Sequence, residues 1–423
     1  MSMDAAKESK RMNTITKVLI AVMLILIAVL VQVFIFSGIG QAREMHMENT
    51  GVSVSYEFDS QAVFHSNSSR FFQFVNRDGI RQINSAGNLD WTDTFSFSRP
   101  MVTTAGDITA VGDYRGRHVH VYNNAGRIFM ADIEYPLLNF TVTETGILTV
   151  IVSYGSGFGV HVYTQQDNHF PGAYYWTVHE RDGMYIPILA EVSDNGRYIA
   201  IAVVDMNVTI STDILFLYTS RADAFGTDRG LFATESFSGQ IVTAMQFMDN
   251  NRLVVAGLYE IRCFQVGPGH AQVRQVWSEP LHNRLSHFAF YGGSHFAFAT
   301  DDRFIGIDDG DPVGTVRIFS VNGVEAGVFQ LGRRVTHLST GNSALIVGAE
   351  RNFHAIDLRG NPLWEHTTLY DTRDVMFLEN TDTVLIAGTT SANIYRRRRV
   401  REDDRDTTIQ DLEFLDSLEG GLQ

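Results

Sequence analysis

The chain contains little cysteine, lysine and proline, and two of these shortages limit what it can be. Cys263 is the only cysteine among 423 residues, so no intramolecular disulfide can form and stability must come from packing and strand pairing. Lysine occurs only at positions 7, 10 and 17, so arginine carries the positive charge beyond the first segment. With a net charge of −15, the chain lacks the clustered positive face that nucleic acid requires, and we expect no nucleic-acid partner.

Long helical patterns are nearly absent after residue 40, and no catalytic motif is present. The sequence has no G-x-S-x-G elbow, no H-E-x-x-H and no cysteine placed with a catalytic-looking histidine, which are arrangements that nucleophilic and zinc-dependent hydrolysis use. Cys263 lies in an apolar stretch and is interpreted as a small buried side chain. These absences favour a binding protein without a cofactor over an enzyme.

One long apolar run is present, at residues 18–39, interrupted mainly by Gln32. At ~1.5 Å per residue it is long enough to span the ~30 Å hydrocarbon layer of a membrane. Four basic residues precede the run and only Arg43 follows it closely, so the positive-inside rule places the N-terminus in the cytoplasm and the rest outside. The run is longer than the roughly 7–15 residues of a cleaved signal. We therefore expect a cytoplasmic segment at 1–17, a retained single-pass anchor in the cell membrane at 18–39, and a tether at 40–55.

The stretch Phe353–Trp364, FHAIDLRGNPLW, is a unit that the chain repeats. An alternating strand leads through a turn glycine into a second strand that carries a tryptophan. The same glycine-to-tryptophan spacing occurs at Gly87–Trp91 and Gly172–Trp176, and looser copies occur at Tyr122–Gly126 and Phe319–Gly323. Repeated hairpins of this kind predict a β-propeller, in which the tryptophans pack between neighbouring sheets.

Eight apolar β-rich runs follow one another at intervals typical of propeller blades. They begin near Ala62, Met101, Phe140, Ile188, Ile241, Leu285, Val335 and Val375. We predict an all-β, eight-bladed propeller over residues 56–395, followed by a charged tail at 396–423. Seven blades is the alternative, because the first copy is degenerate and the fourth is long. The last copy lacks an outer strand, and Val52–Phe58 is expected to supply it and close the ring.

Two groups of residues are candidates for metal binding. His118 and His120 share a strand, and His161 occupies the place of His120 in the next copy. An acidic turn around Gly310 supplies the other candidates, Asp308, Asp309 and Asp311. Imidazole pairs and oxygen-rich loops do bind metals. However, no carboxylate or cysteine recurs beside the histidines, and the aspartate spacing does not match a calcium loop. Packing between blades and turn formation explain these residues with fewer assumptions.

The repeat resembles that of pyrroloquinoline-quinone-type propellers, which are WD40-like in layout. The whole chain is similar to a family of bacterial single-pass membrane proteins of unknown function, in segments such as VGDYRGRHVHVYNNAGRI (Val111–Ile128) and FMDNNRLVVAG (Phe247–Gly257). The resemblance implies a quinoprotein-like fold outside the cytoplasmic membrane. It does not imply quinone chemistry, because quinone enzymes carry a vicinal cysteine pair that this chain lacks.

These observations predict a membrane-anchored extracytoplasmic propeller that serves as a binding platform for a protein or cell-envelope partner. The alternative is a sensor or enzyme that holds a small ligand or metal in the central channel. Ionisable groups that converge on the axis would favour the channel, whereas an exposed apolar patch on one face would favour a protein partner.

Overall fold

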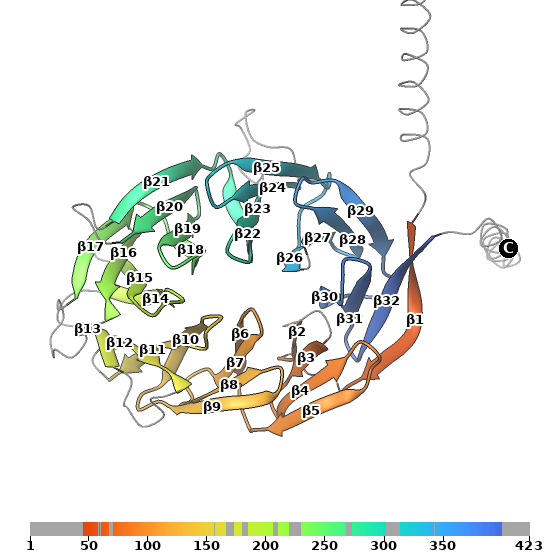
Figure 1. Ribbon diagram of the computed structural model, residues 1–423, viewed down its shortest axis with the longest axis horizontal. Helices are drawn as coiled ribbons and strands as arrows, with labels where there is room; N and C mark the ends of the chain where they lie inside the picture. Colours follow the sequence, from red (N-terminus) through yellow and green to blue (C-terminus); the bar gives the residue numbers. More distant parts are fainter. Residues whose placement is uncertain are drawn as a thin grey trace, which may run out of the picture. The chain divides into compact units, whose positions relative to one another are not determined.

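Short apolar strands, separated by turns rich in glycine and asparagine, form a ring of eight four-stranded antiparallel sheets in the computed structural model (Figure 1). The structure describes residues 45–57, 59, 61–66, 71–155, 157–165, 173–179, 185–205, 210–219, 230–267, 273–301, 314–341 and 343–399. One compact unit, Met47–Arg397, holds the ring. Within the described ranges no helix is long and apolar enough to cross a bilayer. The anchor expected at 18–39 lies outside the described residues.

The first four blades follow the chain in order. Blade 1 comprises β2 (Val63–His65), β3 (Phe71–Val75), β4 (Gly79–Asn84) and β5 (Leu89–Thr94). Blade 2 comprises β6 (Pro100–Ala105), β7 (Ile108–Asp113), β8 (His118–Asn123) and β9 (Gly126–Asp132). Blade 3 comprises β10 (Leu137–Val142), β11 (Leu148–Tyr154), β12 (Gly157–Tyr163) and β13 (Ala173–His179). Blade 4 comprises β14 (Tyr185–Val192), β15 (Tyr198–Asp205), β16 (Ser211–Tyr218) and β17 (Leu231–Phe237).

The remaining blades continue this pattern, and the last one is completed from the start of the chain. Blade 5 comprises β18 (Val242–Phe247), β19 (Arg252–Gly257), β20 (Glu260–Val266) and β21 (Val273–Pro280). Blade 6 comprises β22 (Arg284–Tyr291), β23 (His295–Asp301), β24 (Thr315–Ser320) and β25 (Glu325–Gln330). Blade 7 comprises β26 (His337–Gly341), β27 (Ala344–Ala349), β28 (Asn352–Asp357) and β29 (Pro362–Thr367). Blade 8 comprises β30 (Asp374–Leu378), β31 (Thr383–Ala387), β32 (Ser391–Arg399) and β1 (Met45–Ser55).

The predicted all-β propeller is confirmed, with eight blades and not seven. Each blade begins within three residues of its predicted start. The predicted closure is also confirmed, because β1 pairs with β32 as the outer strand of blade 8. This strand occupies Met45–Ser55, inside the segment assigned to a tether, and not Val52–Phe58. In Figure 1 the red β1 lies beside the blue β32.

The antiparallel strand order gives the ring two different faces. The turns between first and second strands and between third and fourth strands lie on one side, here called the hairpin face. The turns between second and third strands and the connections from blade to blade lie on the other side, here called the crossover face. Residues on the two faces therefore belong to different sets of loops, and each set can diverge while the strands stay intact.

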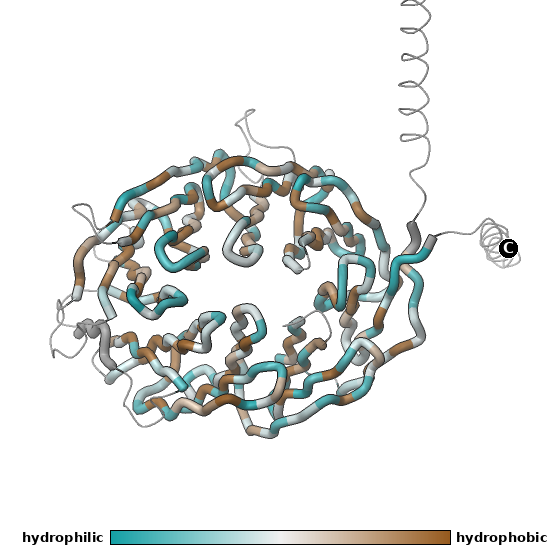
Figure 2. The backbone as a smooth tube through the Cα atoms, viewed as in Figure 1, coloured by the Kyte–Doolittle hydropathy of each residue, from teal (hydrophilic) through white to brown (hydrophobic). Residues whose placement is uncertain are grey.

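Apolar packing between blades holds the ring together. The buried apolar residues that the structure describes fall into eight clusters, one at each interface between neighbouring blades. Figure 2 shows hydrophobic segments within the blades and mostly hydrophilic or neutral turns near the axis. Fully burying a large side chain such as Phe72 or Phe296 contributes about 2–3 kcal/mol. Cys263 lies within one of these clusters and is fully buried, as predicted.

Tryptophans on outer strands link consecutive blades, as predicted. The indole nitrogen of Trp91 donates to the Asn124 carbonyl at 3.1 Å, in the hairpin-face turn of the next blade. Trp364 likewise donates to the carbonyl of Thr381 at 2.8 Å. Trp277 occupies the same place without the predicted turn glycine, and it donates to the Val321 carbonyl at 2.9 Å. The side chain of Trp176, in β13, lies outside the described part.

The arginine run at 396–399 begins inside β32, although the sequence placed it in a solvated tail. Arg397 pairs with Asp382 at 2.8 Å and donates to the Leu363 carbonyl at 3.0 Å. Arg396 lies 3.5 Å from a carboxylate oxygen of Glu379. These contacts connect the last strand to its neighbours, so at least two of the arginines have a structural role.

Candidate functional site

The histidines predicted as metal candidates lie on third strands, away from the axis. His118 is exposed on β8, and its Nδ1 is 2.7 Å from Oδ1 of Asp132. His120 is buried, its Nδ1 is 3.0 Å from the Tyr122 hydroxyl, and its ring meets the edges of two phenylalanines. Burial lowers the pKa of His120 to about 4. It is therefore a neutral packing residue at neutral pH.

His161 has the equivalent environment in blade 3. Its Nε2 is 2.9 Å from the Tyr154 hydroxyl, its ring stacks on Tyr163, and burial lowers its pKa to about 4. No group of three or more histidine, cysteine, aspartate or glutamate side chains suited to a metal occurs in the described part of the chain. The aspartates at 308, 309 and 311 lie outside that part. The structure thus places the histidines in separate hydrogen-bonded pairs.

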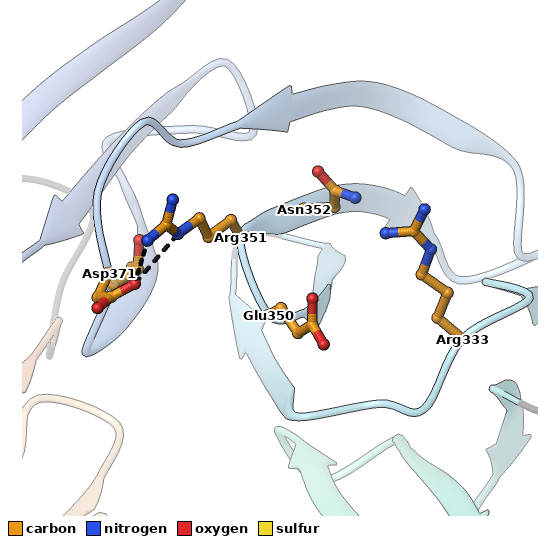
Figure 3. A pocket seen from close by; sticks show the side chains of 6 residues that line it. Arg333, Glu350, Arg351, Asn352 and Asp371 are labelled. Carbon is orange, nitrogen blue, oxygen red and sulfur yellow. Dashed lines mark hydrogen bonds and ion pairs between the residues drawn. The ribbon is translucent and has the colours of Figure 1, made fainter.

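The crossover face carries a groove of about 480 Å³ between its connections (Figure 3). Its lining residues are Arg333, Glu350, Arg351, Asn352, Asp371 and Thr372. Arg351 is bound to the carboxylate of Asp371, at 2.6 and 3.1 Å. The side chains of Arg333 and Glu350, in contrast, make no hydrogen bond or ion pair with a described residue. The groove therefore presents one cation and one anion that are not paired with any of the described residues.

Glu350 occupies a backbone conformation that side chains rarely adopt. Its φ is 56°, in the left-handed region, where a residue other than glycine costs roughly 1–2 kcal/mol. Its backbone N–H is held by the Thr336 hydroxyl at 3.0 Å, so the turn is fixed. Strain of this kind persists where the surrounding structure imposes it, and it often marks a functional position.

The comparisons with known proteins place the chain in a family. Residues 46–395, well over half of the chain, match a family of unknown function designated DUF5711. The chain belongs to this family. No curated protein matches it.

Solved structures similar to this DUF5711 chain are other β-propellers. The Cps50 (Swd1) β-propeller domain of Myceliophteria thermophila is 10% identical, with a TM-score of 0.47, 84% of this chain covered and 100% of the other. BamB from Moraxella catarrhalis is 12% identical, with a TM-score of 0.47, 83% of this chain covered and 100% of the other. At these identities the similarity says nothing about function.

The axial channel of the DUF5711 chain is a second candidate site. The first strands of five blades, β6, β10, β14, β18 and β22, line a cavity of about 280 Å³ toward the hairpin face. A second cavity of about 490 Å³ is lined by β2, β22, β26 and β30. Gln246 and Phe290 line both cavities. Together they form a polar passage large enough for a small molecule, since ligand pockets typically measure about 300–1,000 Å³.

Hydroxyl groups fix the strands that line this channel. First strands expose one backbone edge to the axis, which leaves carbonyl groups without a strand partner. The Thr141 hydroxyl donates to the Ala190 carbonyl at 2.6 Å, and the Thr340 hydroxyl donates to the Phe290 carbonyl at 2.7 Å. These bonds join neighbouring blades at the axis, so the channel wall is held in place.

Ionisable groups in and beside the channel have shifted pKa values. Burial raises the pKa of the Asp374 carboxyl to about 7 and lowers that of His65 to about 4. His337 lies 3.9 Å from Asp374, and burial lowers its pKa to about 4. Burial and the nearby Asp194 raise the pKa of Glu191 well above its usual value. Polar groups of this kind at the axis are what the sequence analysis expected of a ligand-binding channel.

The sequence did not identify Glu191, Glu350 or Asp374. A signal did exist for Glu191, because it is the one charged residue in the apolar segment Tyr185–Val192. Glu350 is preceded by Ala349 and followed by Arg351, and nothing in such a turn distinguishes a strained glutamate from an ordinary exposed one.

Proposed function

We propose that the chain is a membrane-anchored extracytoplasmic propeller that binds a protein partner through the groove on its crossover face. The observation that carries this proposal is Glu350, a strained glutamate that lies in the same groove as Arg333, since neither side chain is paired with a described residue. A left-handed turn position is more stable with glycine, and a strained charged residue without a described partner supports a binding role for its side chain.

The chemistry of the groove defines the partner. Both side chains are exposed, and Glu350 attracts a cationic side chain and Arg333 an anionic one, so the proposed partner presents both charges close together on a loop or strand. Charge complementarity of this type sets specificity and orientation. Apolar contact contributes less, because the exposed large apolar side chains of the described part are distributed around the ring and over both faces. Leu369, 92% exposed, lies in the connection that also supplies Asp371 to the groove.

The location in this proposal is supported by the sequence alone. Residues 18–39 are long and apolar enough for a bilayer, and the basic residues precede them. Because β1 begins at Met45, only a few residues separate the end of this run from the ring. The propeller would then be presented close to the outer surface of the membrane.

Capture of partners from solubilised membranes tests the proposal with the full chain. We expect Arg333→Glu and Glu350→Lys each to reduce recovery of the same partner at least fivefold, whereas Arg274→Glu, an equal charge change on outer strand β21, leaves it unchanged. A partner that Arg274→Glu loses equally, or that neither groove variant loses, would show that the groove is not the binding site.

Cysteine labelling in intact cells tests the proposed extracytoplasmic location of the propeller. Cys263 is buried, so the native chain should not react with a membrane-impermeant maleimide. A Glu365→Cys variant, exposed on β29, should react in intact cells. Labelling that requires cell lysis would place the propeller in the cytoplasm.

A second candidate function is a sensor that binds a small ligand in the axial channel. It is favoured by the carboxyl groups of the channel and their raised pKa values. This function needs no catalytic group and is compatible with a partner on the crossover face.

A further inference from the structure

The cavity near the hairpin face is acidic without compensating positive charge. Three carboxylates line it, Glu144, Asp194 and Glu191, and its described lining includes no arginine, lysine or histidine. Glu144 is exposed at the rim, whereas Asp194 and Glu191 are partly buried. Negative charge therefore continues from the mouth into the interior, which attracts cations and excludes anions.

Glu191 lies on β14, and burial raises the pKa of its carboxyl well above the usual value. It makes no hydrogen bond or ion pair with a described residue, although it lines the cavity. Nearby Asp249, in contrast, is a carboxylate with partners in the fold. It accepts a hydrogen bond from the Arg252 side chain at 2.6 Å and hydrogen bonds from two backbone N–H groups. A partly buried carboxylate without such partners is costly to ionise, since desolvation of a charge is offset only by a counter-charge or donors.

The backbone around Glu191 is held rigidly by β10 and by the turn that follows it. The Thr141 hydroxyl donates to the Ala190 carbonyl at 2.6 Å, and the Thr145 hydroxyl donates to the Asp194 carbonyl at 3.1 Å. Asn139 adds a third hydrogen bond, to the Ile188 carbonyl at 3.0 Å. These bonds fix the strand on both sides of Glu191. A carboxylate on such a support is positioned in advance for a ligand.

The lining favours an organic cation over a metal ion. The described side chains do not assemble a three-ligand metal group here. Instead, the partly buried Phe290 lines the same cavity and supplies a ring for methylene groups and cation–π contact. The adjoining cavity, reached past Gln246 and Phe290, carries another carboxyl group, Asp374. A ligand with two separated amino groups could therefore meet a carboxylate in each cavity.

We propose that the axial channel binds a linear aliphatic diamine or polyamine, with one ammonium group at Glu191 and Asp194 and another directed toward Asp374. This inference rests on the second candidate function, ligand binding in the channel, and does not depend on the crossover-face groove. Ammonium groups supply the missing counter-charge, and the alkyl chain packs on the Phe290 ring between them. Binding also favours the ionised form of Glu191, so it releases a proton where that carboxyl is protonated in the free protein.

Calorimetry on the full chain in detergent, with spermidine and putrescine as probes, tests the proposal. We expect spermidine to bind more tightly than putrescine, and its affinity to increase as the pH rises from 5 to 8. Glu191→Gln should weaken binding at least tenfold and reduce the pH dependence. The matched control is Asp107→Asn, which removes an exposed carboxylate from the hairpin face outside the cavity and should change affinity less than twofold. Circular dichroism confirms that both variants are folded.

The possible negative results distinguish failure of the polyamine assignment from failure of ligand binding in the channel. No spermidine binding, equal loss in Asp107→Asn and Glu191→Gln, or displacement of spermidine by equimolar Mg²⁺ would each overturn the polyamine assignment. Uncharged diols and sugars serve as parallel probes. If one of them binds and Glu191→Gln abolishes that binding, the channel is a ligand site of another class. If no probe binds the channel, the second candidate function fails with the inference.

Discussion

At the scale of single residues, two turn positions have a left-handed backbone conformation, but only one of them carries the glycine that this conformation favours. Gly323 has a φ of 78°, and an added Cβ would lie 2.7 Å from Cγ of Trp277, so glycine is required both by the turn and by the tryptophan that packs there. Glu350 has a φ of 56°, a conformation that glycine would adopt with less strain. The stability of the fold explains why residue 323 is glycine, whereas it does not explain why residue 350 is glutamate.

Replacing each of these two residues tests whether its side chain or its backbone conformation matters for stability. We expect Gly323→Ala to lower the free energy of unfolding by at least about 2 kcal/mol, since it adds both left-handed strain and a clash with a packed ring. Glu350→Gly should leave stability unchanged or raise it by up to about 1 kcal/mol, because relief of strain is partly offset by the entropy of glycine in the unfolded chain. Urea unfolding followed by tryptophan fluorescence measures both. A clear loss of stability in Glu350→Gly would show that its side chain supports the fold and not a partner.

At the scale of elements, the sequence revealed the blades well because the same hairpin pattern recurs along the chain, with a tryptophan on the outer strand of four of the eight blades. The start of β1 was missed because Met45–Gly51 lacks the strict alternation that begins at Val52. The site residues were missed for a different reason. Glu191 and Asp374 acquire their properties from blades distant in sequence, and only the closed ring shows that their strands line one channel.

The closing strand β1 makes a specific prediction about truncation. Met47 is 1% exposed within the cluster between blades 7 and 8, and the Thr50 hydroxyl donates to the Ile394 carbonyl at 2.8 Å. The Tyr56 hydroxyl, just after the strand, donates to the Gly388 carbonyl at 2.7 Å. A chain of residues 45–399 should therefore fold as a soluble monomer, whereas one of residues 57–399 leaves the edge of β32 unpaired and should aggregate.

Size-exclusion chromatography and thermal unfolding of the two chains measure this difference. Adding a synthetic peptide of residues 45–56 to the shorter chain should restore part of its stability, since the strand can pair from outside. Equal stability of the two chains would show that the ring does not depend on β1 for closure.

At the scale of the whole molecule, buried ionisable groups of both kinds determine how stability responds to acid. His65, His120, His161 and His337 have their pKa lowered from 6.5 to about 4 by burial. Between these values the unfolded chain binds more protons than the folded one, so each histidine lowers stability as the pH falls from 6.5 to 4. Asp374 acts in the opposite direction. Its pKa is raised from 3.8 to about 7, so its folded form binds the proton first and gains stability over the same range.

The histidines should dominate this balance, because four downward shifts outweigh the upward shift of Asp374 even when the raised pKa of Glu191 is added. A shift of one pKa unit corresponds to about 1.4 kcal/mol, so we expect several kcal/mol of stability to be lost between pH 7 and pH 4. Urea midpoints at half-unit intervals of pH give the curve. Asp374→Asn removes an opposing group and should steepen the acid loss. A midpoint that rises toward pH 4 would mean that the channel carboxyls, and not the buried histidines, control the stability of the ring.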